Sequence, residues 1–126
     1  MSLSYDFSEL VDCYLLKNRK KTINILNENN PNSEDNILIL RSFLFKLKRL
    51  KKLKNKVDNK KNIDQIINTF KPPIFWKEKE VVKQQLKQRS LSDIKFLIKK
   101  VNNLEVLIKK NSQTSNQILN NFILDN

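Results

Sequence analysis

The sequence predicts an all-α fold, arranged as a single helical bundle of five to seven helices. The chain contains no glycine, which disfavours the tight turns that close β-hairpins. No segment alternates apolar and polar residues, whereas apolar residues recur every three or four positions over long stretches. The polar connections between these stretches are short, so we expect residues 1–126 to form one domain.

The first two helices are expected at residues 7–17 and 19–29. Asp6 can cap the first of them, and Glu9 is placed for a reciprocal capping box. Its apolar stripe consists of Phe7, Leu10, Val11, Tyr14 and Leu15. The second helix must end before Pro31, because a proline disfavours helical geometry in the preceding residue.

A long central helix is expected to begin after Ser33, which can cap it. Glu34 and Asp35 lie in its first turn, where negative charge suits the positive end of the helix dipole. A polar loop at residues 55–62 is expected to end it. Its apolar stripe comprises Ile37, Leu40, Phe43, Leu44, Leu47 and Leu50.

Four further helices are expected at residues 63–69, 77–88, 90–110 and 114–124. Ser90 and Asp93 have the spacing of a variant capping box at the start of the third. Glu105 and Lys109 lie four residues apart on it, in the order that favours an ion pair.

The missing residue types exclude several classes of function. Without glycine, the chain cannot form a Walker loop or a dinucleotide-binding fingerprint. Without histidine, it lacks the commonest general base and the His-ligated metal sites. The one cysteine, Cys13, has apolar neighbours that indicate a buried thiol. The paired carboxylates lie at helix starts, where capping explains them. We therefore expect no catalytic residue, cofactor, metal or small-molecule substrate, and no enzymatic activity.

The sequence also gives expectations about location. No stretch approaches the roughly 20 apolar residues of a transmembrane helix. The N-terminus lacks the basic segment and apolar run of a signal peptide. Residues 1–3 are either native or an expression remnant. A reduced, cytoplasmic setting without a membrane partner is the expectation.

Positive charge is concentrated in residues 46–56. Lys and Arg total 25 against 13 acids, a net charge of +12. The candidate nucleic-acid face consists of Lys48, Arg49, Lys51 and Lys52. Such a face can track phosphates, with steeply salt-dependent binding. A solvated helix surface explains the same pattern, as does the codon bias of an AT-rich genome; contact with an anionic membrane is a third and weaker reading.

One break in the helical pattern stands out. It consists of Pro72, Pro73, Ile74, Phe75, Trp76 and Lys77. The prolines stop one helix, and Lys77 is expected to start the next. We interpret Ile74, Phe75 and Trp76 mainly as a core plug between helices. The alternatives are an exposed anchor for a partner protein and a platform for stacking on a nucleobase.

The order of these residues resembles a known family. The break is followed by a basic helix, then by Arg89, Ser90 and Leu91 opening a helix that carries Glu105 and Lys109. This order resembles the C-terminal domain of the bacterial DNA polymerase III delta subunit. The helix at 7–17, the helix that starts at Arg19 and the long helix resemble the start of that domain, so the resemblance covers nearly the whole chain.

The resemblance implies a role in DNA replication. In that family the domain is an all-helical collar module that packs against equivalent domains of the other clamp-loader subunits. It thereby holds together a ring that serves a DNA-directed DNA polymerase. The chain would then be the C-terminal domain of a longer subunit, a non-catalytic scaffold whose contact with DNA is indirect or weak. The alternative is a stand-alone nucleic-acid-binding protein that uses the face at residues 46–56.

Overall fold

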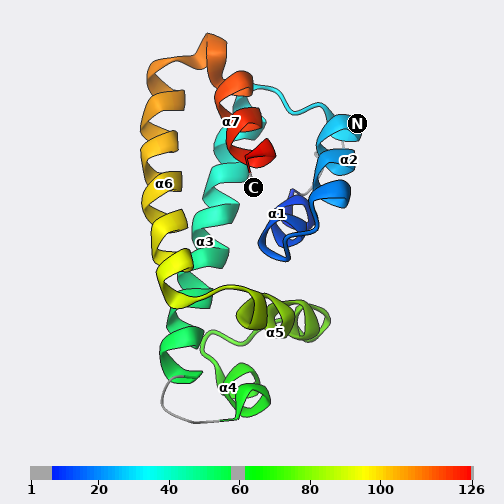
Figure 1. The fold of residues 1–126 in the computed structure, drawn as a ribbon, viewed down its shortest axis with the longest axis vertical. Coiled ribbons are helices and arrows are strands. Elements are labelled where there is room, and N and C mark those ends of the chain that lie inside the picture. The colour runs from blue at the N-terminus through cyan, green and yellow to red at the C-terminus, as the bar shows by residue number, and fades with distance from the viewer. Residues whose placement is uncertain (1–6, 58–61, 126) are drawn as a thin grey trace.

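The described residues of the chain fold into helices and connecting turns, which confirms the predicted all-α class. The computed structural model describes residues 7–57 and 62–125, and within them there is no strand (Figure 1). The elements are α1 (Ser8–Leu15), α2 (Arg19–Asn29), α3 (Ser33–Val57), α4 (Ile63–Thr69), the 3-10 helix η1 (Trp76–Glu78), α5 (Lys79–Gln88), α6 (Leu91–Lys110), the 3-10 helix η2 (Ser112–Thr114) and α7 (Ser115–Leu124).

Two long helices, α3 and α6, form the spine of the bundle. They run antiparallel and pack against each other more extensively than any other pair of described elements (Figure 1). The buried apolar residues of α6 follow the expected period of three to four: Ile94, Leu97, Val101, Leu104 and Ile108. Those of α3 are Ile39, Leu40, Phe43, Leu47, Leu50 and Leu53. Periodicity therefore located most of the core face of α3, although Ile37 and Leu44 are only partly buried and Ile39 and Leu53 are buried without having been expected.

Helices α1, α2 and α7 cover one part of this spine. Tyr14, Phe43 and Phe122 meet there, one from each of α1, α3 and α7, with ring centroids 5.0 to 5.4 Å apart. Such aromatic clusters bury large areas and favour edge-to-face geometry. The Arg19 guanidinium, at the start of α2, donates to the carbonyl oxygen of Leu124 at the end of α7.

Helices α4 and α5 pack against the C-terminal part of α3 (Figure 1). The Lys54 ammonium of α3 donates to the carbonyl oxygen of Leu86 in α5 over 2.8 Å. This bond satisfies one of the carbonyls that the last turn of a helix leaves without a partner.

Of the two expected helix caps within the described residues, one is confirmed and one is corrected. Ser90 caps α6 as expected, because its hydroxyl accepts from the Asp93 amide over 3.1 Å. The cap of α3 is Asn32 rather than Ser33. Asn32 Oδ1 accepts from the Asp35 amide over 2.8 Å, and Asp35 Oδ2 accepts from the Asn32 amide over 3.0 Å. The expected cap at Asp6 lies outside the described residues.

The cap of α3 lies one residue earlier than expected because of the position of Asp35. A reciprocal capping box needs an acidic or amide side chain three residues after the cap. Asp35 stands three residues after Asn32, so the pair satisfies two backbone amides at once. The residue three positions after Ser33 is Asn36, whose side-chain amide is engaged with Ser115 and Asn116 instead.

Helix α5 also begins two residues later than the expected start at residue 77. Lys77 lies within the 3-10 turn η1, and α5 itself begins at Lys79.

Two phenylalanines on α3 test the position of the core. We expect Phe43→Ala to lower the free energy of unfolding by about 3–5 kcal/mol, because Phe43 is fully buried in the aromatic cluster. Phe45→Ala, two residues away with a 61% exposed side chain, should cost less than about 1 kcal/mol. Urea unfolding of both variants measures the difference, and equal losses would contradict the assigned core.

Candidate functional site

The segment that crosses from α4 to α5 places its aromatic residues on the surface. Phe75 is 55% exposed and Trp76 is 69% exposed, so the interpretation of these two side chains as a core plug is wrong. Ile74 is buried, which confirms that member of the expected plug, and Phe70 fills the gap between the helices with it. We call Phe75 and Trp76 the aromatic surface.

The backbone of the segment explains this division. Phe70 and Phe75 both have extended backbone angles, and Ile74 immediately precedes Phe75. Angles of this kind are close to polyproline II, in which successive side chains point about 120° apart. With Ile74 directed into the core, Phe75 therefore points away from it, and Trp76 opens the turn η1 beside it. Pro72, Pro73 and Lys77 are exposed as well.

The two exposed rings form one patch with a cation beside it. Their centroids are 5.9 Å apart at an angle of 55°. The Lys77 ammonium lies 5.4 Å from the centre of the Trp76 ring, within the range of a cation–π contact. Large, rigid rings in such a patch are typical of the anchors of protein interfaces.

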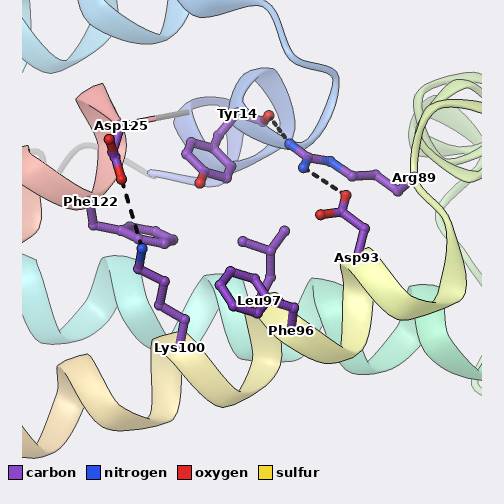
Figure 2. A pocket seen from close by; sticks show the side chains of 8 residues that line it. All are labelled: Tyr14, Arg89, Asp93, Phe96, Leu97, Lys100, Phe122 and Asp125. Carbon is purple, nitrogen blue, oxygen red and sulfur yellow. Dashed lines mark hydrogen bonds and ion pairs between the residues drawn. The ribbon is translucent and has the colours of Figure 1, made fainter.

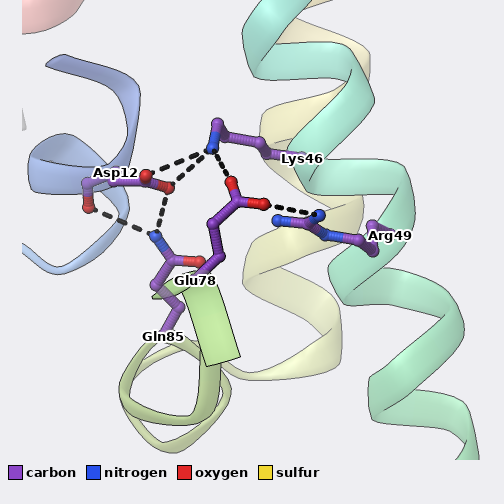
Figure 3. Close-up of polar contacts among 5 residues, drawn as sticks. All are labelled: Asp12, Lys46, Arg49, Glu78 and Gln85. Carbon is purple, nitrogen blue, oxygen red and sulfur yellow. Dashed lines mark hydrogen bonds and ion pairs between the residues drawn. The ribbon is translucent and has the colours of Figure 1, made fainter. Parts of the chain in front are cut away.

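A cluster of charged side chains joins this segment to the spine (Figure 3). The Lys46 ammonium of α3 lies 3.0 Å from a carboxylate oxygen of Asp12 in α1 and 3.4 Å from one of Glu78 in η1. The Arg49 guanidinium lies 3.8 Å from Glu78. Gln85 of α5 donates to the Asp12 carboxylate over 3.0 Å. We call these five residues the ion cluster.

The ion cluster ties four elements together at one point. Lys46 is only 4% exposed, and a buried ammonium is tolerated only when it is paired. Its two carboxylate partners come from elements far apart in sequence, so α1 and η1 are both drawn to α3. Because Glu78 follows Trp76 by two residues, the cluster also fixes where the aromatic surface lies.

Some basic residues of the run at 46–56 are bound to other parts of the fold, whereas others remain on the surface without a partner among the described residues. Lys46 and Arg49 are engaged with carboxylates, and Lys54 bonds the end of α5. Lys56 lies over the Phe70 ring, 5.4 Å from its centre. The candidate nucleic-acid face therefore loses Arg49 and keeps its other three members, Lys48, Lys51 and Lys52.

A cavity of about 290 Å³ lies between α1, α6 and α7 (Figure 2). Arg89, which the sequence analysis assigned no contact, lies at its edge with its side chain buried. It donates to the carbonyl oxygens of Tyr14 and Leu15 over 2.8 and 3.0 Å, and to the Asp93 carboxylate over 2.9 Å. Arg89 lies one residue before the Ser90 cap and four before Asp93. This spacing is the sequence signal that could have predicted its ion pair with Asp93.

The charged residues that line the cavity contact one another and help to hold the helices together. Arg89 pairs with Asp93, and Lys100 pairs with Asp125 at 3.9 Å. Arg89 holds the last carbonyls of α1 against the start of α6, where a guanidinium is a suitable partner. The lining residues are Tyr14, Arg89, Asp93, Phe96, Leu97, Lys100, Phe122 and Asp125.

Two titrating groups lie in the core nearby. Burial raises the pKa of the Cys13 thiol, which matches the expectation of a buried cysteine. Burial also raises the pKa of Tyr14 to about 12, against the opposing effect of Arg89. Within residues 7–57 and 62–125, no three His, Cys, Asp or Glu side chains gather as metal ligands would. No helix in the same ranges has the length and apolar character to cross a membrane.

Comparisons with known proteins return no relative. No protein-family model, no curated protein and no solved structure matches the chain.

The ion cluster can be tested by removing its central ammonium. We expect Lys46→Met to lower the free energy of unfolding by roughly 3 kcal/mol, because Asp12 and Glu78 would lose their partner in a mostly buried site. Lys48→Met is the matched control: it removes the same charge from an exposed position on the same helix and should change the value by no more than about 0.5 kcal/mol. Equal effects in urea unfolding would show that the cluster contributes nothing.

Tyr14 makes stability depend on pH at the alkaline end. Because its folded pKa of about 12 exceeds the ordinary value, the folded chain keeps a proton that the unfolded chain loses. The free energy of unfolding should therefore fall as pH rises from roughly 10 to about 12. In Tyr14→Phe this contribution is absent, so its stability should decline less steeply over the same range. Parallel curves for the two proteins would refute the assignment.

Proposed function

We propose that this chain is a non-catalytic scaffold domain that joins neighbouring subunits of a multisubunit assembly, with the aromatic surface as its anchor. The observation that carries the proposal is the exposure of Phe75 and Trp76 in a segment that the ion cluster holds in place. Tryptophan is enriched among the residues that dominate binding energy at interfaces.

The ion cluster makes the aromatic surface a suitable anchor. Association costs conformational entropy for every side chain and loop that becomes ordered. Glu78 is already bound to Lys46, and Ile74 is already buried, so the segment on both sides of the rings is fixed before a partner arrives. Little ordering then opposes binding.

The area available also fits an anchor within a larger interface. Phe and Trp each bury about 150–250 Å² when packed, whereas a specific interface buries at least about 1,000 Å² in total. Other exposed apolar side chains can supply further contact. Among them, Phe45 lies over the Arg49 guanidinium, which itself contacts Glu78.

The sequence resemblance suggests which assembly this is. The order of Pro72, Pro73, Phe75, Trp76 and Lys77 with the helices around it resembles the collar domain of the DNA polymerase III delta subunit. On that basis, the proposed partners are the other clamp-loader subunits, and the domain would hold the ring together during replication. The all-helical fold is compatible with such a collar.

A binding experiment with paired variants tests the proposal. We expect the folded chain to bind the remaining clamp-loader subunits in a pull-down, and Trp76→Ala to weaken that binding about 30-fold or more, the effect of losing a hot spot of roughly 2 kcal/mol. Phe96→Ala removes another exposed aromatic ring, on α6, and serves as the matched control with little expected change.

Two results would contradict the proposal. Failure of the folded chain to bind any of these subunits would remove the clamp loader as the assembly. Equal losses for Trp76→Ala and Phe96→Ala would show that the aromatic surface is not the anchor.

A further inference from the structure

The facing parts of α3 and α6 contain no acidic residue. Between residues 36 and 57 of α3, and between residues 94 and 104 of α6, there is neither Asp nor Glu. These two stretches lie side by side in the antiparallel pair that forms the spine (Figure 1). In a chain with 13 acids, positive charge is therefore left without local neutralisation along one part of the spine.

A groove between the two helices collects lysines from both. It is open, has a volume of about 260 Å³, and is lined by Lys51 of α3 and by Lys95, Ile98, Lys99, Asn102 and Asn103 of α6. Of these six lining residues, only Lys51 belongs to the candidate nucleic-acid face expected from the sequence. Lys95 and Lys99 join it only through the packing of α6 against α3.

The three lysines of the groove have no partner in the described part of the chain, unlike Lys46 and Lys54 of α3. Among the described residues, no ion pair or hydrogen bond engages the ammonium of Lys51, Lys95 or Lys99. Lys46, by contrast, is neutralised within the ion cluster, and Lys54 bonds the end of α5. Lys48 and Lys52, both exposed, extend the unpaired charge along α3 next to the groove.

We infer that this α3–α6 groove binds the phosphate backbone of a single-stranded nucleic acid. Lys95 and Lys99 stand one helical turn apart on the same face, so they can contact neighbouring phosphates of one strand while Lys51 contacts it from the opposite wall. The side-chain amides of Asn102 and Asn103 can donate to and accept from base edges.

The lining of the groove favours a single strand over a duplex. The exposed bases of a single strand can reach Ile98 and the side-chain amides, whereas a duplex keeps its bases stacked inside and offers mainly phosphates. Ile98 in the lining offers an apolar contact for a base. The inference does not depend on the proposed scaffold role, because it uses a different part of the surface from Phe75 and Trp76.

The experiment measures binding of a fluorescent single-stranded oligonucleotide, as DNA and as RNA, over a range of salt concentrations. The groove variant is Lys51→Gln, Lys95→Gln and Lys99→Gln combined. The matched control combines Lys20→Gln, Lys87→Gln and Lys110→Gln, which remove three positive charges from exposed positions on α2, α5 and α6 outside the groove. Circular dichroism verifies that both variants keep their helical content.

We expect the groove variant to bind at least about tenfold more weakly, and to lower the slope of log affinity against log salt by about 2, since each phosphate contact contributes about 0.7 for a single strand. The control should lose less than about threefold. No binding at low salt, or equal losses in both variants, would overturn the inference.

Two competitors test the identity of the occupant. A duplex of the same sequence and polyglutamate should each displace the oligonucleotide less readily than an unlabelled single strand does. Tighter binding of the duplex would overturn the preference for a single strand. Tighter, groove-dependent binding of polyglutamate would overturn the inference in favour of an acidic protein partner.

Discussion

The buried ammonium of Lys46 is the constraint on which the arrangement of the chain depends. A charge that is 4% exposed must be paired, and its partners Asp12 and Glu78 belong to α1 and η1. Pairing therefore joins two distant parts of the chain to α3 at one point. Since Glu78 follows the aromatic pair closely, the same interaction anchors the segment in which Phe75 and Trp76 are exposed and Ile74 is buried.

The positive charges of α3 consequently have two different roles. Some of them hold the bundle together: Lys46 and Arg49 pair with carboxylates, and Lys54 bonds the end of α5. Others, such as Lys51, are left for the surface and meet lysines of α6 in the groove. A run of lysines in a sequence is thus not one functional face, because the packing around the helix decides which charges remain available.

Local patterns in the sequence predicted most of the fold. Apolar periodicity located the helices and the buried faces of α3 and α6, because this signal depends on neighbours within one helix. The cap of α6 at Ser90 followed from the same kind of local rule. The exposure of Phe75 and Trp76 did not follow from a local rule, since hydrophobicity alone assigned both rings to the core. Which side chains fill the gap between α4 and α5 depends on Phe70, Ile74 and the pairing of Glu78. All three involve contacts across the bundle.

The fluorescence of Trp76, the only tryptophan in the chain, tests the exposed aromatic surface most directly. Acrylamide quenching of the isolated chain measures how freely solvent reaches the indole ring. With Trp76 69% exposed, we predict red-shifted emission and quenching close to that of a tryptophan in an unfolded chain. Blue-shifted emission with strong protection from acrylamide in the isolated, monomeric chain would contradict the account and return Trp76 to the core.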